Sequence, residues 1–325
     1  MPSENITLVT GANGFIGRKL CMKLQKNGVF VRALLRKKIN GPWDDVIVAD
    51  LATDELLPSD FKNVSSIFHL AGKAHAIDEL NCTPDEYFNI NVGGTKKLLE
   101  IAVLAKTKKF IYCSSIKAMG EGGDIPLIES APNLPITSYG KSKLAAEELV
   151  VNFDKIPHRS VFRPAMVYGP NNPGNLDKMI NAISKGLFPP WPNIPNKRSM
   201  VHVDDVVNAA LLIENHVKAN KQIFIVTDGH YYSTSNIVNW IRKALKRKKQ
   251  TIYIPFIALK WAAFLGDIIS FIARRKMPLT SDNLAKLVNS SAYDSSKIQS
   301  MLGFRPEWDL ESAIPVIIAT KTGSK

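Results

Sequence analysis

Tyr139, Lys141 and Lys143 lie together in the segment TSYGKSK and are residue types suited to proton transfer. Residues four positions apart are neighbours on one face of a helix, so Lys143 can reach the hydroxyl of Tyr139. Lys141 is only two positions away and is expected on the solvent side. A phenol with a pKa of about 10 is a poor acid or base at neutral pH, and a nearby ammonium lowers that pKa. The segment therefore predicts acid–base chemistry by Tyr139 with help from Lys143.

A glycine-rich turn near the N-terminus indicates which molecule would lie beside that tyrosine. Gly11, Gly14 and Gly17 in TLVTGANGFIG follow a strand-like run and open a helical one. Glycines there permit a tight turn and close approach of a pyrophosphate, whose charge meets free amides at the helix start. The pattern predicts a dinucleotide site. The same turn contributes Asn13, Phe15 and Ile16.

The next two strand-like runs end in residues expected beside the adenosine half of the dinucleotide. Sheets that bind NAD commonly end the second strand in an acidic residue that holds the ribose hydroxyls. Here that run ends in Leu-Arg-Lys-Lys, and Arg36 can instead hold the 2′-phosphate of NADP and stack on adenine. We therefore expect NAD(P)(H), with NADP favoured over NAD. Asp50 and Leu51, at the end of the next run, are expected at the adenine.

Alternating strand-like and helical runs supply the framework for these residues. Strands are expected at residues 5–12, 29–36, 46–50, 65–72, 109–115, 159–169 and 222–228. Helices are expected in the segment IGRKLCMKLQKNG and at residues 87–106 and 138–153. This alternation predicts an α/β fold with a Rossmann-type, doubly wound parallel sheet covered on both faces.

The regular alternation of strands and helices ends after Pro170, where proline-rich and loop-rich segments begin. We expect a dinucleotide-binding domain over residues 1–170, with residues 200–228 returning to it. A smaller C-terminal substrate-binding region is expected over residues 171–199 and 229–325. Such a region would close over the carboxyl ends of the strands, where open α/β sheets bind ligands.

Composition narrows the class of protein. The 325 residues are 45% apolar and 22% charged, as in globular proteins. Three scattered cysteines predict neither a disulfide framework nor a metal site, and together with the absence of a signal sequence they favour the cytoplasm. The net charge of +13 favours anionic partners, but no RNA motif or zinc spacing accompanies the basic runs at 242–249 and 273–277. Nucleic acid is therefore not expected as a partner.

An apolar stretch at residues 251–273 lies between the two basic runs and is nearly long enough to cross a membrane. Pro255, Lys260, Gly266 and Asp267 interrupt it, and two charges near a bilayer centre would cost several kcal/mol. We expect one or two buried or interfacial helices instead. Peripheral contact with a membrane surface is the alternative.

Six motifs in this order, TGANGFIG, HLAG, NVGGT, CSS, YGKSK and RPAMVYGP, resemble the extended short-chain dehydrogenase/reductase family. That family includes the NAD-dependent nucleotide-sugar epimerases, dehydratases and reductases, and the resemblance covers essentially the whole chain. It implies that Ser115 hydrogen-bonds the reacting oxygen, so that Ser115, Tyr139 and Lys143 form the catalytic set. It also implies that an oxidised nicotinamide ring helps the ammonium to favour the phenolate.

The resemblance implies further contacts with the cofactor. Ser114 would face the cofactor, and Asn91 would support the region around it. Pro164 and Val167 would flank the nicotinamide. The HLAG motif would add Leu70, Ala71 and Gly72. Members of the family commonly form homodimers through a four-helix interface, which would include the helix of Tyr139.

The substrate side resembles the sugar-nucleotide branch of the family. Arg198 precedes the segment VHVDDV, where such members carry an arginine that holds the nucleotide diphosphate with its bidentate guanidinium. Asn175 matches an asparagine that reaches the same diphosphate. These two residues imply a UDP-sugar substrate. His69 and His202 lie in apolar runs and are expected in the core rather than in the site.

Two reactions compete for that substrate, and a third interpretation has no reaction. AGKAHA, SSIKAMGE, NKRSMV and VTDGHYYST are most similar to reductases of UDP-4-keto-6-deoxy-N-acetylhexosamines, which serve surface polysaccharide synthesis. The alternative is a UDP-glucose or UDP-N-acetylglucosamine 4-epimerase with bound NAD, but such epimerases usually carry tyrosine where this chain has Met119. A dehydratase fits less well, because CSSIK lacks the Asp–Glu pair. A non-catalytic nucleotide-sensing protein is the third interpretation.

Overall fold

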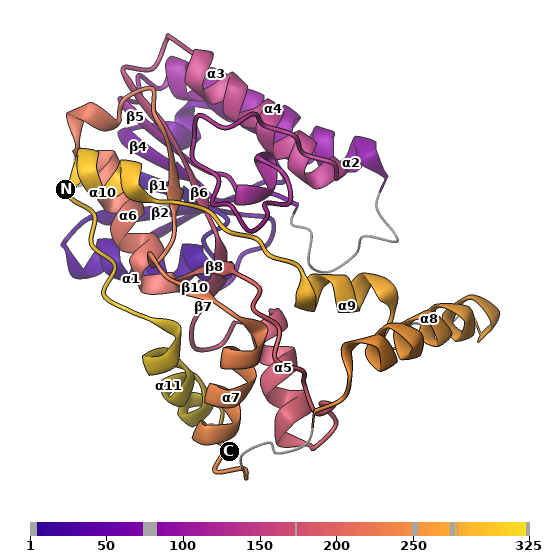
Figure 1. Cartoon of the computed structure of the whole chain (residues 1–325). Coiled ribbons are helices and arrows are strands. Elements are labelled where there is room, and N and C mark those ends of the chain that lie inside the picture. Colours follow the sequence, from indigo (N-terminus) through magenta and orange to yellow (C-terminus); the bar gives the residue numbers. More distant parts are fainter. Residues whose placement is uncertain are drawn as a thin grey trace.

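Seven parallel strands form the central sheet of the computed structural model, which describes residues 5–73, 83–172, 174–248, 253–273, 277 and 279–322 (Figure 1). The strands are β1 (Ile6–Thr10), β2 (Phe30–Leu35), β3 (Asp45–Val48), β4 (Val64–His69), β5 (Lys109–Cys113), β6 (His158–Pro164) and β9 (Ile223–Val226). Their order in the sheet is β3-β2-β1-β4-β5-β6-β9. This order confirms the predicted doubly wound α/β fold and places its switch point between β1 and β4, where such sheets bind ligands.

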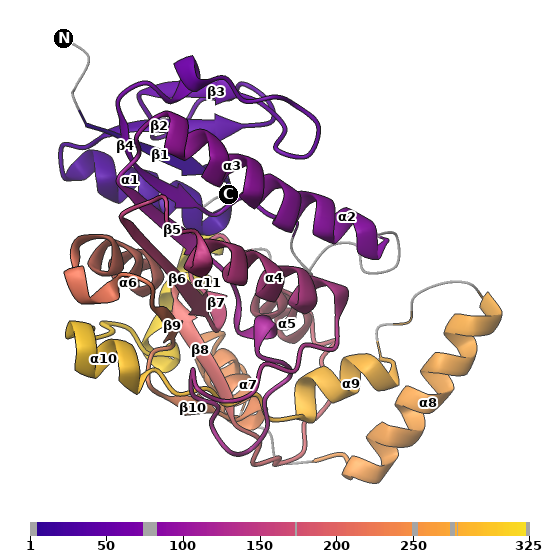
Figure 2. The ribbon, with the colours of Figure 1, turned by 90° about the horizontal axis from the view of Figure 1, so that it is seen from above.

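Helices cover both faces of the sheet (Figures 1 and 2). One face carries α3 (Gly94–Leu104) and α4 (Ser138–Asn152), whose apolar residues pack with the strands in one buried cluster. The other face carries α1 (Phe15–Lys26), α6 (Val203–Asn215) and α10 (Ser296–Leu302), which form a second cluster. Burial on both faces explains why the strands read as nearly continuous apolar runs.

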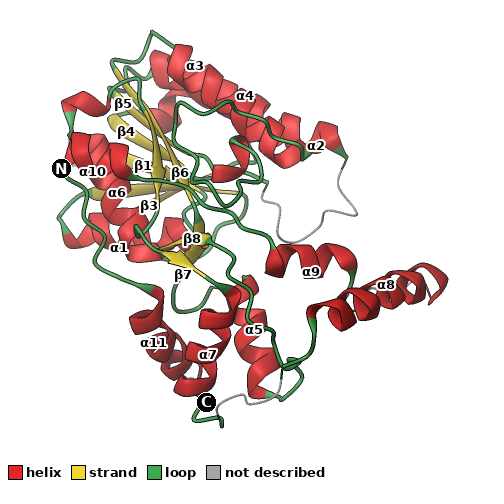
Figure 3. Ribbon diagram, viewed as in Figure 1, coloured by secondary structure: helices red, strands yellow, loops and turns green. Residues whose placement is uncertain are grey.

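A second, smaller sheet lies beyond the carboxyl ends of the large one (Figure 3). It consists of β7 (Met166–Tyr168), β8 (Arg198–His202) and β10 (Tyr231–Tyr232). The helices α5 (Asn175–Ser184), α7 (Thr234–Ala244), α9 (Ser281–Val288) and α11 (Leu310–Thr322) surround it. Their buried residues, with those of the small sheet, form a third core.

The predicted single strand at 159–169 is wrong, because it divides between the two sheets. β6 ends at Pro164, which has no amide hydrogen to offer a neighbouring strand. The amide of Ala165 donates to the carbonyl oxygen of Val226 at 3.0 Å, and the chain then enters β7, which pairs with β8. This break lets one segment pass from the dinucleotide side to the substrate side.

The predicted helix at 87–106 is also interrupted. It consists of α2 (Pro84–Phe88), a π-helical turn at Asn89–Gly93 and α3. A π turn carries one extra residue within an otherwise α-helical run and is frequent at functional sites. Asn91 lies within it and is buried.

The helix α8 (Phe256–Ala273) projects from the body and contacts α9 (Figures 1 and 2). Within the part of the chain that the structure describes, it is the one helix long and apolar enough, by length and composition, to cross a membrane. Residues 251 and 252 of the predicted apolar stretch lie outside the described residues. Only Leu259, Ala263 and Gly266 of the helix are buried, so of the two expected alternatives the helix is not the buried one, and an interfacial helix stays a prediction.

Candidate active site

Tyr139 and Ser115 come together where α4 begins beside the end of β5. The side chain of Thr137 caps α4 by accepting a hydrogen bond from the amide of Gly140 at 3.0 Å. Tyr139 is the second residue of that helix, and its hydroxyl is hydrogen-bonded to the side chain of Ser115. Ser115 in turn caps a short 3-10 turn, accepting from the amide of Lys117 at 3.2 Å. The two hydroxyls therefore lie together, in position to bind one substrate oxygen.

Gly140 explains how the two elements approach so closely, a role that the sequence analysis missed. A Cβ atom at this position would lie 2.4 Å from the carbonyl oxygen of Lys117, well inside van der Waals contact. Only glycine therefore lets the first turn of α4 pack against the 3-10 turn that follows Ser115. The signal was present in the sequence as the glycine directly after the tyrosine.

Lys143 lies one helical turn after Tyr139 and is almost fully buried, whereas Lys141 is exposed. Its Nζ donates to the carbonyl oxygen of Cys113 at 2.7 Å and lies 4.2 Å from the centroid of the Tyr112 ring. The amine is thus held against the end of β5. A Cβ atom built on Gly72 would lie 3.9 Å from it, so the loop after β4 also borders the amine.

Burial dominates the pKa values of both residues of the pair. Burial raises the pKa of Tyr139 to about 12, although the hydrogen bond from Ser115 opposes the rise. Cys113, Tyr87 and Glu147 add to the rise. Burial lowers the pKa of Lys143 itself to about 8. In this structure Tyr139 is therefore a neutral phenol, which suits a proton donor.

Asn91 connects the loop after β4 with α4. Its Oδ1 accepts from the amide of Lys73 at 2.8 Å, and its Nδ2 donates to the carbonyl of Lys73 at 3.2 Å. The same Nδ2 donates to Oγ of Ser142 at 2.9 Å, and that hydroxyl donates to the carbonyl of Tyr139 at 2.8 Å. The π turn therefore supports the helix that carries the tyrosine. Ser142, between the two lysines of the motif, was also missed.

The glycine turn between β1 and α1 has the geometry that close approach to a ligand requires. Gly11 has a φ of +67°, and a Cβ atom there would lie 2.7 Å from the amide nitrogen of Ala71. A Cβ atom on Gly17 would lie 2.2 Å from the carbonyl oxygen of Gly11. Gly14 is the N-cap of α1 and offers no side chain to the first amides of that helix. These amides are therefore available to an anionic group.

The residues expected at adenosine lie at the same edge of the sheet. Arg36 directly follows β2 and is exposed, and Asp50 lies just beyond the end of the neighbouring strand β3. The carboxylate of Asp50 accepts from the amide of Ala52 at 2.9 Å, so one of its oxygens is already used to hold the turn. Leu51 is buried behind it.

The residues expected at the nicotinamide lie near the ends of β5 and β6. Ser114 is buried, and its Oγ has no hydrogen-bond partner among the described residues. Pro164 ends β6, and Val167 lies in β7 with its carbonyl held by Nδ2 of Asn172 at 2.6 Å. Leu70 follows β4 directly and lies next to Ala71 at the glycine turn.

The two residues expected to hold the substrate diphosphate, Arg198 and Asn175, lie on different elements. Arg198 lies in β8, and its guanidinium donates to the carbonyl of Lys286 in α9. Burial lowers its pKa below the usual value. Asn175 is the first residue of α5 and is exposed. No hydrogen bond links the two among the residues described, so a shared ligand would have to bridge them.

The two core histidines behave as expected. His69 is buried with its ring nitrogens 2.7 Å from Oγ1 of Thr10 and 3.0 Å from Oγ1 of Thr95, and burial lowers its pKa to about 3. His202 is buried and stacks on Trp308. Residues 74–76 of the AGKAHA motif lie outside the described residues. Within the described ranges no group of three His, Cys, Asp or Glu residues could hold a metal ion.

The glycine turn, the Ser–Tyr–Lys set and the strand order occur together in one family, whose model matches residues 7–227. This chain belongs to the NAD dependent epimerase/dehydratase family. A UDP-glucose 4-epimerase of Vibrio cholerae is 31% identical over 314 residues, covering 94% of this chain and 92% of the relative. An N-acetyl-alpha-D-glucosaminyl-diphospho-ditrans,octacis-undecaprenol 4-epimerase of Escherichia coli O157:H7 is 23% identical over 316 residues, covering 96% and 93%. The structure of MoeE5 in complex with UDP-glucose and NAD has a TM-score of 0.77 at 25% identity, covering 98% of this chain and 99% of that one.

The residues of this epimerase/dehydratase-family enzyme fit the dinucleotide of the family. The close packing at Gly11 leaves the turn free of side chains, and the first amides of α1 offer hydrogen-bond donors to a pyrophosphate. The unpartnered hydroxyl of Ser114 is buried at the edge where a ligand group can satisfy it. The cofactor supplies hydride transfer when bound. Beside it the chain offers the hydroxyl of Tyr139 and the buried amine of Lys143.

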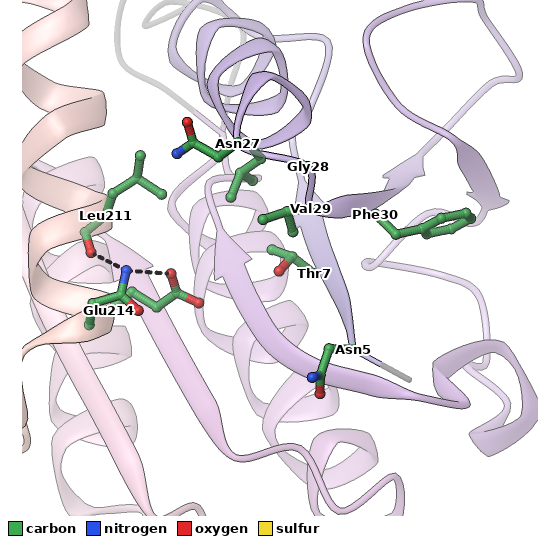
Figure 4. Close-up of a pocket in the computed structure, with 10 residues that line it drawn as sticks. Asn5, Thr7, Asn27, Gly28, Val29, Phe30, Leu211 and Glu214 are labelled. Atoms are coloured by element: carbon green, nitrogen blue, oxygen red, sulfur yellow. Dashed lines mark hydrogen bonds between the residues drawn. The ribbon is translucent and has the colours of Figure 1, made fainter. Parts of the chain in front are cut away.

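A cavity of about 460 Å³ lies at the opposite end of the large sheet (Figure 4). It is bordered by the amino-terminal ends of β1 and β2 and by the ends of α1 and α6. The side-chain Nδ2 of Asn215 donates to the carbonyl of Leu211 at 3.0 Å within it. Glu214 is the one charged side chain of its lining. Its lining does not include Ser115, Tyr139 or Lys143, so the cavity is separate from the candidate active site.

Replacing Lys143 by methionine is expected to stabilise the enzyme without cofactor at pH 7. The folded-state pKa is about 8 against 10.5 for the free side chain, so the buried ammonium costs the fold up to roughly 3 kcal/mol at pH 7. The variant also loses the hydrogen bond to Cys113, which reduces the expected gain in stability by about 1 kcal/mol. Between these two pKa values the unfolded chain binds more protons, so wild-type stability rises with pH there and the advantage of the variant shrinks.

Denaturant unfolding of both proteins at pH 7 and at pH 9.5 measures this difference. The exposed Lys141→Met variant is the matched control and should follow the wild type at both pH values. A Lys143→Met variant less stable than wild type at pH 7 would show that the buried ammonium stabilises the fold instead of destabilising it.

Proposed function

We propose that this enzyme is a nucleotide-sugar oxidoreductase that acts at carbon 4 of a UDP-linked sugar. The observation that carries the proposal is the pairing of the Tyr139 and Ser115 hydroxyls at the end of β5, beside the buried amine of Lys143. The printed names of the Vibrio cholerae relative and of the MoeE5 complex support a UDP-sugar as the substrate class. Arg198 and Asn175 are the residues proposed to hold its diphosphate.

The first candidate reaction is reduction of the 4-keto group of a UDP-4-keto-6-deoxy-N-acetylhexosamine. As hydride is added at carbon 4, Tyr139 donates its proton to the oxygen that becomes a hydroxyl, and Ser115 hydrogen-bonds that oxygen. A phenol with a raised pKa is protonated at neutral pH, which is the state that this direction of reaction requires. The charge of Lys143 stabilises the phenolate that is left.

The residues at the adenosine end favour an exchangeable cofactor over a permanently held one. Arg36 is exposed and stands where an acidic residue would bind both ribose hydroxyls of NAD, so we propose NADPH as the preferred reductant. Met119 is buried where the family's 4-epimerases usually carry tyrosine.

We also propose that the enzyme is a cytoplasmic homodimer. Its interface would be formed by α3 and α4, which lie side by side.

The second candidate is 4-epimerisation of UDP-glucose or UDP-N-acetylglucosamine with NAD that stays bound. The 31% identity to the Vibrio cholerae UDP-glucose 4-epimerase favours it. In this reaction Tyr139 first takes the proton of the 4-hydroxyl and later returns it to the other face. That direction needs the phenolate, which makes the raised pKa of Tyr139 unfavourable until the cofactor's charge is present.

A turnover test separates the candidates. The purified enzyme is expected to consume NADPH faster than NADH, followed by loss of the absorbance of the reduced cofactor, when given a UDP-4-keto-6-deoxy-N-acetylhexosamine. Interconversion of UDP-glucose and UDP-galactose, or of their N-acetyl forms, without added nicotinamide would establish the epimerase instead. A protein silent in both assays but able to bind nucleotide would fit the non-catalytic interpretation.

A further inference from the structure

The helix α8 has an apolar surface that no described part of the chain covers. It is 18 residues long, which is about 27 Å of helix, and it leaves the body beside α9 (Figures 1 and 2). One continuous stripe of large side chains is exposed along it. The stripe consists of Ile257, Trp261, Phe264, Leu265, Ile268 and Ile272. A single exposed apolar residue is ordinary, but a stripe of this length marks an interaction site.

The side of α8 that faces the body is fixed in place. A Cβ atom on Gly266 would lie 1.9 Å from the carbonyl oxygen of Leu279, so the helix is packed as tightly as glycine allows. The carboxylate of Asp267 accepts from the amide of Ser281, the first residue of α9, at 3.1 and 3.3 Å. A helix crossing a bilayer would have to break these bonds and bury Asp267, so the stripe is presented while α8 stays attached to the protein.

The charges around the stripe indicate what covers it. Lys260 is the one charge on the exposed side, near the start of the helix, and its Nζ lies over the ring of Phe256, 4.9 Å from the centroid. In the sequence, basic runs at 242–249 and 274–276 precede and follow the helix, and the whole chain carries +13. A second copy would bring the same positive charges to the interface, whereas an anionic surface is attracted by them.

We propose that α8 binds the surface of an anionic phospholipid bilayer. The stripe enters the boundary between headgroups and acyl chains, with the helix axis in the membrane plane. Lys260 extends its amine to the headgroups, and Trp261 lies at the depth that its ring prefers. The positive charge that the sequence carries on either side of the helix adds to the attraction for anionic lipid. Because α8 packs on α9, and α9 accepts the hydrogen bond of Arg198, the substrate side lies next to the bound membrane.

Sedimentation with lipid vesicles tests this proposal on the full-length protein. We expect the wild type to bind vesicles of mixed phosphatidylcholine and phosphatidylglycerol, and to bind pure phosphatidylcholine or vesicles at high salt much more weakly. The triple variant Trp261→Gln/Leu265→Gln/Ile268→Gln is expected to lower the partition coefficient by at least about tenfold. Circular dichroism should show that this variant keeps its helix content.

The matched control removes as many exposed apolar side chains elsewhere. Met22→Gln/Leu57→Gln/Val217→Gln should bind vesicles as the wild type does, since these three residues are exposed on the dinucleotide-binding side. A wild type that stays in the supernatant with both kinds of vesicle overturns the proposal. So does a wild-type dimer that the α8 variant converts to monomer without any vesicle binding, because the stripe would then be covered by a second copy. Neither readout depends on which sugar the enzyme transforms.

Discussion

Tyr139→Phe is expected to reduce kcat by about 10³-fold while leaving cofactor affinity close to that of the wild type. The change removes the one hydroxyl that is hydrogen-bonded to Ser115 and placed to give a proton to the substrate oxygen. The ring remains, with its centroid 6.2 Å from that of Tyr87, so the packing at the start of α4 is kept. Single-turnover kinetics with saturating substrate measure the loss, and fluorescence titration with NADPH measures binding.

The same chemical change at an exposed tyrosine provides the control. Tyr253→Phe removes a hydroxyl from an exposed tyrosine that belongs to neither β5 nor α4, and it should leave both quantities unchanged. If Tyr139→Phe retained more than about a tenth of the wild-type kcat, a different group would be the proton donor. If it lost cofactor affinity instead, the hydroxyl would be acting in binding rather than in chemistry.

Glu147→Ala is expected to destabilise the enzyme by about 3–5 kcal/mol, which is a large part of the stability of an ordinary domain. Glu147 and Arg163 are both almost fully buried, and the guanidinium donates to the two carboxylate oxygens from Nε at 2.9 and 3.1 Å and from Nη2 at 2.5 Å. Nη1 of Arg163 has no partner among the described residues. Removing the carboxylate therefore leaves a buried cation without its counter-charge.

Urea unfolding of a double-mutant cycle measures this effect. Glu147→Leu combined with Arg163→Met replaces the pair by apolar residues of similar volume and should recover most of the loss. Asp282→Ala, which breaks an exposed pair with Lys286, should cost less than about 0.5 kcal/mol. A Glu147→Ala variant as stable as wild type would mean that water reaches the guanidinium.

This ion pair also belongs to the active-site helix. Glu147 lies one turn after Lys143 on the same face of α4 and raises the pKa of that lysine, against the larger effect of burial. Tyr139, Lys143 and Glu147 thus form one line along the helix, in which each residue is four positions from the next. The buried ion pair of Glu147 with Arg163 therefore holds in place the same helix that carries Tyr139 and Lys143.

The central sheet could be predicted because its strands are dense in β-branched residues and alternate with helices at regular spacing. The glycine turn and the choice of Lys143 over Lys141 followed from local spacing alone, which is why the structure places these residues as expected. The raised pKa of Tyr139 could not be predicted, because it comes from burial by tertiary contacts that local spacing does not show. The position of the Lys143 amine could not be predicted either, because its partner, the carbonyl of Cys113, is thirty residues away in the chain.

The helix α8 shows a different limit of sequence analysis. Hydrophobic periodicity identifies the buried side of a helix from the contrast between its polar and apolar faces. A helix that is apolar on nearly every side has no such contrast, so its sequence does not show whether it is buried in a core or exposed outside one. Only the contacts of Gly266 and Asp267 show which side faces the protein. The break of the predicted strand at Pro164 is similar, because the second sheet that receives β7 is made from residues later in the chain.

The order of the strands also governs what happens while the chain leaves the ribosome. β1 lies in the interior of the sheet, and β2, β3, β4, β5 and β6 each add beside a strand that has already been made. β9 follows its neighbour after the longest interval, because β6 ends at Pro164 and β9 begins only at Ile223. During that interval a nascent chain exposes the unpaired edge of β6, which is a template for pairing with another chain. A product that ends near residue 170 would keep that edge and is expected to aggregate.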